Sequence, residues 1–238
     1  MHVARRVLLV LGFLVLALAV LLTGFILSVA SHPGPGLPEW KLGRALAPFP
    51  LPVAELVCGR AGGPLLCLRG YYRERLKGPV VGNPARPCQG LTGLAARACS
   101  EVTGLRLVEG GVSRPLAVCE SLPDPLACAR YVGRGAFVRG GFEKGGEGSA
   151  AQVCAQGKGE VLANCRVGAA MEAVERVGKP ILRAAEAFCL PYNQDLCWWG
   201  VLSALAARYR NRPQEALDAC SLLSPLGAGR CALAFKAR

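Results

Sequence analysis

Hydrophobic residues are distributed in two different ways along this chain. Residues 7–30 form an unbroken run of 24 residues without a charge. As an α-helix this run would be roughly 36 Å long, enough to cross a ~30 Å hydrocarbon core. Beyond residue 50 the apolar residues recur instead at helical spacing, as in Leu162, Cys165 and Ala169. The first pattern predicts a membrane-spanning helix, and the second predicts amphipathic helices in a folded domain.

The residues that flank the apolar run set its predicted orientation. Arg5 and Arg6 precede the run, so the positive-inside rule places residues 1–6 in the cytoplasm and the rest outside. The run exceeds the ~7–15 apolar residues of a signal peptide, so we predict an uncleaved signal anchor. The alternative is a cleaved signal peptide, because the small side chains of Ser28 and Ala30 fit a cleavage site after Ala30. The protein would then be secreted.

The remainder of the chain divides into a predicted Pro/Gly tether, residues 31–50, and an extracytoplasmic repeat domain, residues 51–238. Twelve cysteines occur, all beyond the apolar run, and they fall into six pairs. The first members of successive pairs recur every 30–35 residues, a period that is typical of helical repeats. The pairs are Cys58 with Cys67, Cys88 with Cys99, Cys119 with Cys128, Cys154 with Cys165, Cys189 with Cys197, and Cys220 with Cys231.

Each pair brackets the turn of a predicted helix–turn–helix unit. An apolar, alanine-containing run precedes the first cysteine, and a longer helical stretch follows the second. In residues 119–128, CESLPDPLAC, Asp124 is placed to cap the second helix and Pro125 to occupy its first turn. Strand-like alternation is nearly absent. The sequence therefore predicts an all-α solenoid of about six cysteine-stapled units.

Disulfide bonds within each unit are the predicted role of the cysteines. An oxidising compartment lets disulfides persist, and a turn brings two helices to the ~4.4–6.8 Å Cα separation that a disulfide requires. Pairing between neighbouring units is the alternative, because spacing alone does not fix connectivity. The sequence has no C-x-x-C motif, which disfavours metal ligation and thiol redox chemistry. We expect neither a metal nor a cofactor.

Few residues suit catalysis. The histidines are His2 and His32, both outside the predicted repeat domain, which disfavours a Cys–His or Ser–His nucleophile. Glu172 and Glu175 share one predicted helix, so an envelope hydrolase with paired carboxylates is the least favoured alternative. We predict no catalytic residue.

Residues 133–151 are rich in glycine and separate the third unit from the fourth. They match neither G-x-G-x-x-G nor G-x-x-x-x-G-K-[ST], the spacings of phosphate-binding loops. We predict an irregular surface loop here, with contact to a ligand as the alternative.

The cysteine pairs that bracket each α-hairpin turn resemble those of secreted, disulfide-stapled helical repeat proteins related to Sel1-like repeats. The resemblance covers residues 51–238 and rests on pair spacing and period, since the Sel1 consensus itself is absent. It implies an exported interaction scaffold.

Arginine and tyrosine occur together in three of the predicted second helices. Stacked units would align them as a basic stripe with aromatic platforms, which suits nucleic acid or acidic polysaccharide. The alternative is a solvated face whose cations favour helix C-termini. Trp198 and Trp199 are interpreted as packing between units, with a ligand platform as the alternative. The candidate binding residues are Arg69, Tyr72, Arg73, Arg130, Tyr131, Arg134, Arg208, Tyr209 and Arg212.

These observations favour a membrane-anchored, extracytoplasmic helical-repeat scaffold that binds a protein or another component of the cell envelope. Binding of an anionic polymer through the Arg/Tyr stripe is the alternative function. The sequence does not predict an oligomeric state.

Overall fold

The computed structural model of the chain describes residues 12, 13, 15–20, 23, 24, 38–80, 82–140 and 147–236. Every regular element within these residues is helical, which confirms the prediction of an all-α fold. The chain divides into two compact units, residues 1–77 and residues 78–238. Each unit is described by itself below.

The predicted signal anchor, residues 7–30, lies in part outside the described residues. None of the helices in the described part of the chain combines the length and the apolar character that a membrane crossing requires. The described residues of this segment are helical, and large apolar side chains among them, such as Phe13 and Leu16, are exposed.

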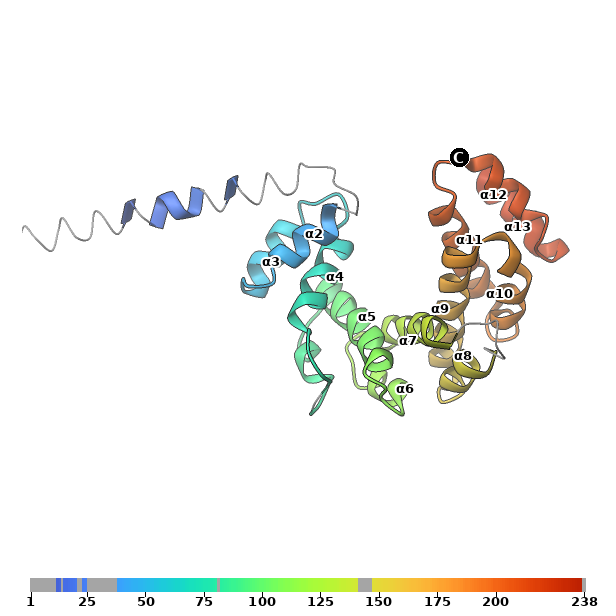
Figure 1. Cartoon of the computed structure of the whole chain (residues 1–238), viewed down its shortest axis with the longest axis horizontal. Helices are drawn as coiled ribbons and strands as arrows, with labels where there is room; N and C mark the ends of the chain where they lie inside the picture. The colour runs from blue at the N-terminus through green and yellow to red at the C-terminus, as the bar shows by residue number, and fades with distance from the viewer. Residues whose placement is uncertain are drawn as a thin grey trace, which may run out of the picture. The chain divides into compact units, whose positions relative to one another are not determined.

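Six helical hairpins follow, each made of a short helix that ends at the first cysteine of a pair and a longer helix that contains the second. In the first unit α3 (Leu51–Cys58) leads into α4 (Pro64–Arg75). Figure 1 shows the short and long helices of a hairpin side by side, most clearly for the last one. The hairpins of the second unit are η1 (Arg86–Cys88) with α5 (Gly93–Glu109), α6 (Pro115–Cys119) with α7 (Pro125–Gly140), α8 (Glu147–Cys154) with α9 (Gly159–Val177), α10 (Leu182–Cys189) with α11 (Gln194–Arg208), and α12 (Pro213–Cys220) with α13 (Pro225–Lys236).

A disulfide closes each hairpin, so the predicted pairing within units is confirmed and the alternative of pairing between units is not observed. The Cα atoms of each bonded pair are 5.4–5.7 Å apart, within the usual range for disulfides. The predicted cap is also confirmed. The Oδ1 atom of Asp124 accepts a hydrogen bond of 3.0 Å from the backbone N–H of Ala127, in the first turn of α7.

Consecutive long helices of the second unit pack against each other, α5 on α7, α7 on α9, α9 on α11 and α11 on α13. The closest approaches occur at glycines. A β-carbon at Gly133 of α7 would lie 1.8 Å from the carbonyl oxygen of Cys165 in α9. A β-carbon at Gly168 of α9 would lie 1.8 Å from the carbonyl oxygen of Arg130 in α7. Any side chain at either position would therefore force the two helices apart.

The sequence did not predict the helix α2 (Pro38–Ala45), which packs on α4. As in the pair α7 and α9, a glycine of each helix lies against a backbone carbonyl of the other. A β-carbon at Gly43 would lie 1.7 Å from the carbonyl oxygen of Cys67, and one at Gly70 would lie 2.3 Å from that of Trp40. α2 falls within residues 31–50, so the prediction of an unstructured tether over this whole range is corrected. The range contains a helix because the helix has a packing partner in α4.

The predicted irregular loop, residues 133–151, is also largely helical. α7 continues to Gly140 and α8 begins at Glu147, while residues 141–146 lie outside the described residues. Gly135 of this segment faces α5, where a β-carbon would lie 3.1 Å from the Cβ atom of Val108. Gly133 and Gly135 therefore reflect close helix packing, and the prediction of an irregular loop is corrected for residues 133–140 and 147–151.

Substitution of Gly133 by alanine tests the glycine crossing. The new methyl group would overlap the Cys165 carbonyl, so Gly133→Ala should lower the free energy of unfolding by at least about 2 kcal/mol. The control is Arg183→Ala, at an exposed position of α10. It should change the free energy of unfolding by less than about 0.5 kcal/mol. Urea unfolding followed by circular dichroism measures both, and equal effects would contradict the crossing.

Candidate functional site

The candidate residues of the first unit, Arg69, Tyr72 and Arg73, lie on α4. Tyr72 is buried, and its ring meets that of Tyr71 edge-on with the ring centroids 5.2 Å apart. Burial raises the pKa of Tyr72 far above its ordinary value, with a smaller contribution from Tyr71. Arg69 and Arg73 are partly buried and each has an interaction partner. Tyr72 therefore belongs to the core of the first unit and offers no exposed stacking platform.

Arg134 of α7 joins two carboxylates of α9. Its Nε atom donates to the Oε2 atom of Glu172 at 2.8 Å, and an Nη atom donates to Glu175. Burial alone would lower the pKa of Arg134, but the nearby carboxylates outweigh burial and raise it. Glu172 also accepts a hydrogen bond of 2.6 Å from Arg176 in the next turn. The two glutamates considered as an acid–base pair are thus engaged in ion pairs between α7 and α9.

Arg208 caps the C-terminus of a neighbouring helix. Its Nη1 atom donates to the backbone carbonyls of Glu175 and Arg176, at 2.5 and 3.0 Å, in the last turn of α9. Carbonyls in this turn have no partner within the helix, and a cation there also interacts favourably with the helix dipole. Arg139 of α7 does the same for α5, because its Nη1 atom donates to the carbonyl of Val108 at 2.9 Å. Arg208 therefore acts in packing of the second unit.

The last candidates follow the end of α11. The guanidinium of Arg212 pairs with Glu215 at 3.2 Å and lies 5.3 Å from the ring centroid of Tyr209. Tyr209 itself is buried, whereas Arg212 is exposed. Tyr131 is partly buried, with the guanidinium of Arg134 5.5 Å from its ring centroid. Both arginine–tyrosine contacts are local, one just after α11 and the other within α7.

One candidate arginine contributes to an exposed surface. Arg130 of α7 donates from Nη2 to the Oδ1 atom of Asn164 in α9, at 2.6 Å. Its guanidinium carbon lies 4.7 Å from the ring centroid of Trp199 in α11. Asn164 is held in turn, because its Nδ2 atom donates to the Glu160 carbonyl at 2.9 Å. Residues from three successive long helices thus meet at this point, which we call the Trp199 platform (Arg130, Asn164 and Trp199).

The Trp199 platform combines an exposed aromatic ring with a desolvated cation. Trp199 is 48% exposed, although its neighbour Trp198 is only 2% exposed and packs towards Gly227 of α13. The structure thus supports the packing interpretation for Trp198, whereas Trp199 presents its ring to the surface. Burial lowers the pKa of Arg130, and the positive charge of nearby Arg97 lowers it further, against the opposing effect of acidic neighbours.

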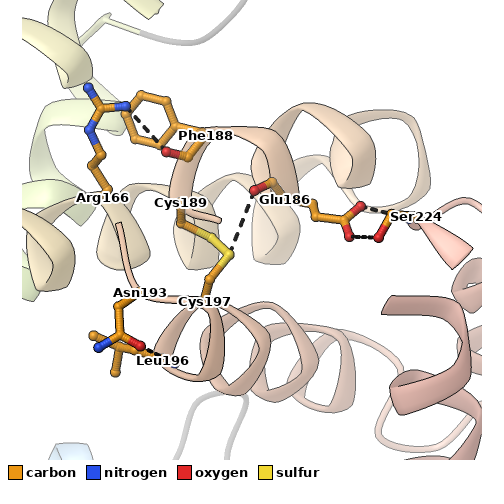
Figure 2. Close-up of a disulfide and its surroundings, with 8 residues drawn as sticks. All are labelled: Arg166, Glu186, Phe188, Cys189, Asn193, Leu196, Cys197 and Ser224. Atoms are coloured by element: carbon orange, nitrogen blue, oxygen red, sulfur yellow. Dashed lines mark hydrogen bonds between the residues drawn. A yellow bond between two sulfur atoms is a disulfide. The ribbon is translucent and has the colours of Figure 1, made fainter. Parts of the chain in front are cut away.

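Another arginine–aromatic contact, which the sequence did not predict, lies at the turn between α10 and α11. The guanidinium carbon of Arg166 lies 4.5 Å from the ring centroid of Phe188 and 4.1 Å from that of Tyr192. Figure 2 shows Arg166 against the Phe188 ring, with an N–H donating to the Phe188 carbonyl at 3.3 Å. Tyr192 is 42% exposed. Arg166 and Tyr192 are 26 positions apart, so no local sequence pattern could link them.

The same view shows how the last two hairpins are joined. The disulfide of Cys189 with Cys197 closes α10 on α11, and the buried Glu186 of α10 reaches Ser224 before α13 (Figure 2). One carboxylate oxygen of Glu186 accepts from the Ser224 backbone N–H at 2.8 Å, and the other from its hydroxyl at 2.5 Å. This buried carboxylate fixes the start of α13 and is satisfied by hydrogen bonds.

The first unit contains an apolar pocket of about 490 Å³ between α2 and α3. Leu42, Val53, Leu56 and Val57 contribute to its lining, together with the charged residues Glu39 and Arg60. Within the described residues no group of three His, Cys, Asp or Glu side chains is arranged to hold a metal ion. The pocket offers apolar surface and carries no cluster of polar groups that would indicate chemistry on a substrate.

Removal of the Arg134 guanidinium tests its assignment to helix packing. Arg134→Gln would leave Glu172 and Glu175 partly buried without their shared cation, so the free energy of unfolding should fall by about 2–3 kcal/mol. Arg210→Gln, at an exposed position, is the control and should change it by less than about 0.5 kcal/mol. Chemical denaturation measures both, and an unchanged stability for Arg134→Gln would show that Arg134 is a surface cation.

The strongest candidate for function is the Trp199 platform, because it is the place where an exposed indole and a partly buried guanidinium are held together by neighbouring helices. No protein-family model, no curated protein and no solved structure matches this chain.

Proposed function

We propose that this protein is a membrane-anchored, extracytoplasmic scaffold of stacked helical hairpins that binds a protein partner through the Trp199 platform. The compartment, the architecture and the binding surface are supported by different observations.

The compartment is argued from the disulfides and the apolar run. All twelve cysteines are paired in six disulfides, and such bonds persist in an oxidising environment outside the cytoplasm. The 24 uncharged residues at positions 7–30 provide a segment of the length that a membrane anchor needs. Two arginines before the run favour a cytoplasmic N-terminus and an exported repeat domain.

The architecture is argued from the succession of long helices in the second unit. Each long helix contacts the next one along the chain, from α5 to α13. Contact restricted to neighbours is the property that defines a solenoid. We therefore propose an α-solenoid for the hairpins, in which extended surface rather than a single deep cleft is available to a partner.

The binding surface is argued from the chemistry of the Trp199 platform. Tryptophan and arginine are enriched among the residues that carry most of the energy of protein–protein interfaces. The indole of Trp199 lies on a helix, and Arg130 stacks on it while bonded to Asn164. Little side-chain entropy remains to be lost when a partner covers the ring, because the ring is already held in place.

A protein partner is favoured over an anionic polymer by the state of the other arginines. Arg134 pairs with two carboxylates, Arg208 caps α9, and Arg212 pairs with Glu215. Polymer binding depends on cations that can neutralise phosphates or carboxylates of the ligand. In the second unit these three arginines already have anionic or carbonyl partners, so they would have to give up existing contacts to bind a polymer.

Photo-crosslinking in intact cells tests the proposed function. A photoreactive phenylalanine analogue in place of Trp199 should form a protein adduct of discrete mass, while the same analogue at Leu94, which is also 48% exposed, should not. The adduct at position 199 should weaken at least tenfold with Arg130→Met, because the guanidinium no longer supports the ring. Equal adducts at both positions, or adducts with nucleic acid or polysaccharide that disappear in high salt, would contradict a protein partner.

A further inference from the structure

The disulfides provide a common register for the long helices, because each long helix carries the second cysteine of a pair near its start or middle. In α7, α9 and α11 the residue two positions after that cysteine contacts another long helix, and in α11 it is Trp199, which contacts Arg130 of α7. In α7 this residue is Arg130, which contacts Asn164 of α9. In α9 it is Val167, whose Cγ1 atom lies 2.5 Å from where a β-carbon at Gly200 of α11 would be.

The same position in α13 is Leu233, two residues after Cys231. No helix of the described chain covers it, and Leu233 is 72% exposed. Leu226 is 57% exposed and lies two helical turns earlier on the same face. Leu222, in the turn before α13, is 42% exposed. An apolar face of α13 is therefore exposed at the position where α7, α9 and α11 contact another long helix.

Gly229 lies between the two exposed leucines of α13 on this face. No heavy atom lies within 4 Å of the position that its β-carbon would occupy. At Gly133, Gly168 and Gly200 the corresponding space is filled by a neighbouring helix. The face has a glycine at which another helix could approach closely, flanked by leucines that such an approach would bury. We call it the α13 face (Leu222, Leu226, Gly229 and Leu233).

We propose that the α13 face is the interface of a two-fold symmetric dimer, in which α13 of one chain crosses α13 of a second copy at Gly229. The reciprocal crossing of α7 and α9, with a glycine of each helix against a carbonyl of the other, shows this packing within the chain. A two-fold axis at Gly229 would likewise place Gly229 of each copy against the backbone of α13 in the other copy. Isologous contacts of this kind are the commonest route to a closed oligomer.

The charges beside the α13 face are self-complementary. Arg230 of α13 pairs with Asp195 at the start of α11, at 2.8 Å. Asp195 is 86% exposed and Arg230 43% exposed by side chain, so each retains access for a second partner. Because a two-fold axis brings the same rim of both copies together, the cation of one chain can pair with the carboxylate of the other. A single-signed rim would instead repel its own copy.

Sedimentation equilibrium of the purified full chain in density-matched detergent micelles tests the dimer. The native chain should sediment with the mass of two copies at micromolar concentration, and Leu233→Glu should sediment as one copy. Leu94→Glu, which introduces the same charge on α5, is the control and should remain dimeric.

Gly229→Gln separates loss of the interface from loss of the fold. The substitution has free space in a single chain and replaces glycine with a better helix former, so the variant should melt no lower than the native chain diluted until it is monomeric. The longer side chain should nevertheless abolish the dimer by blocking close approach. A native chain that stays monomeric at every concentration, a dimer that survives both α13 substitutions, or growth beyond two copies would each overturn the proposal.

Discussion

The structure depends on one covalent constraint, the disulfide that joins the end of a short helix to the adjacent long helix. The short helices contain three to eight residues, from η1 to α12, and helices of this length are marginal in water by themselves. Closing a loop of about ten residues contributes about 2.5–3 kcal/mol in the chain-entropy model. Each disulfide thereby holds a short helix against the neighbouring long one.

The same disulfides also fix where neighbouring long helices meet. In three crossings the carbonyl group that touches a glycine belongs to the second cysteine of a pair: Gly43 with Cys67, Gly104 with Cys128, and Gly133 with Cys165. The bond therefore holds not only its own hairpin but also the backbone atom on which the preceding helix rests. Arg139 of α7 then closes the far end of the α5–α7 crossing by capping the last turn of α5, and Arg208 of α11 caps the last turn of α9 in the same way.

Cysteine spacing and turn residues predicted the hairpins, the pairing and the Asp124 cap, because each depends on residues within about ten positions. Local sequence patterns did not predict the packing roles of the glycines and arginines. Glycines after position 133 indicated a loop, although Gly133 and Gly135 serve close packing against helices that lie elsewhere in the sequence. Arg130, Arg134 and Arg208 suggested a ligand-binding stripe, yet their partners lie 32–41 positions away. Contacts over such distances follow from helix packing and leave no local pattern.

The Cys154–Cys165 disulfide is expected to stabilise two hairpins, its own (α8 and α9) and the preceding one (α6 and α7). Amide hydrogen exchange of a Cys154→Ala, Cys165→Ala double variant tests this most directly, with exchange followed separately in α7 and α9. The account predicts that protection falls in α9 and also in the part of α7 around Gly133, since the Cys165 carbonyl rests there. Loss of protection confined to α8 and the start of α9, with α7 unchanged, would contradict it.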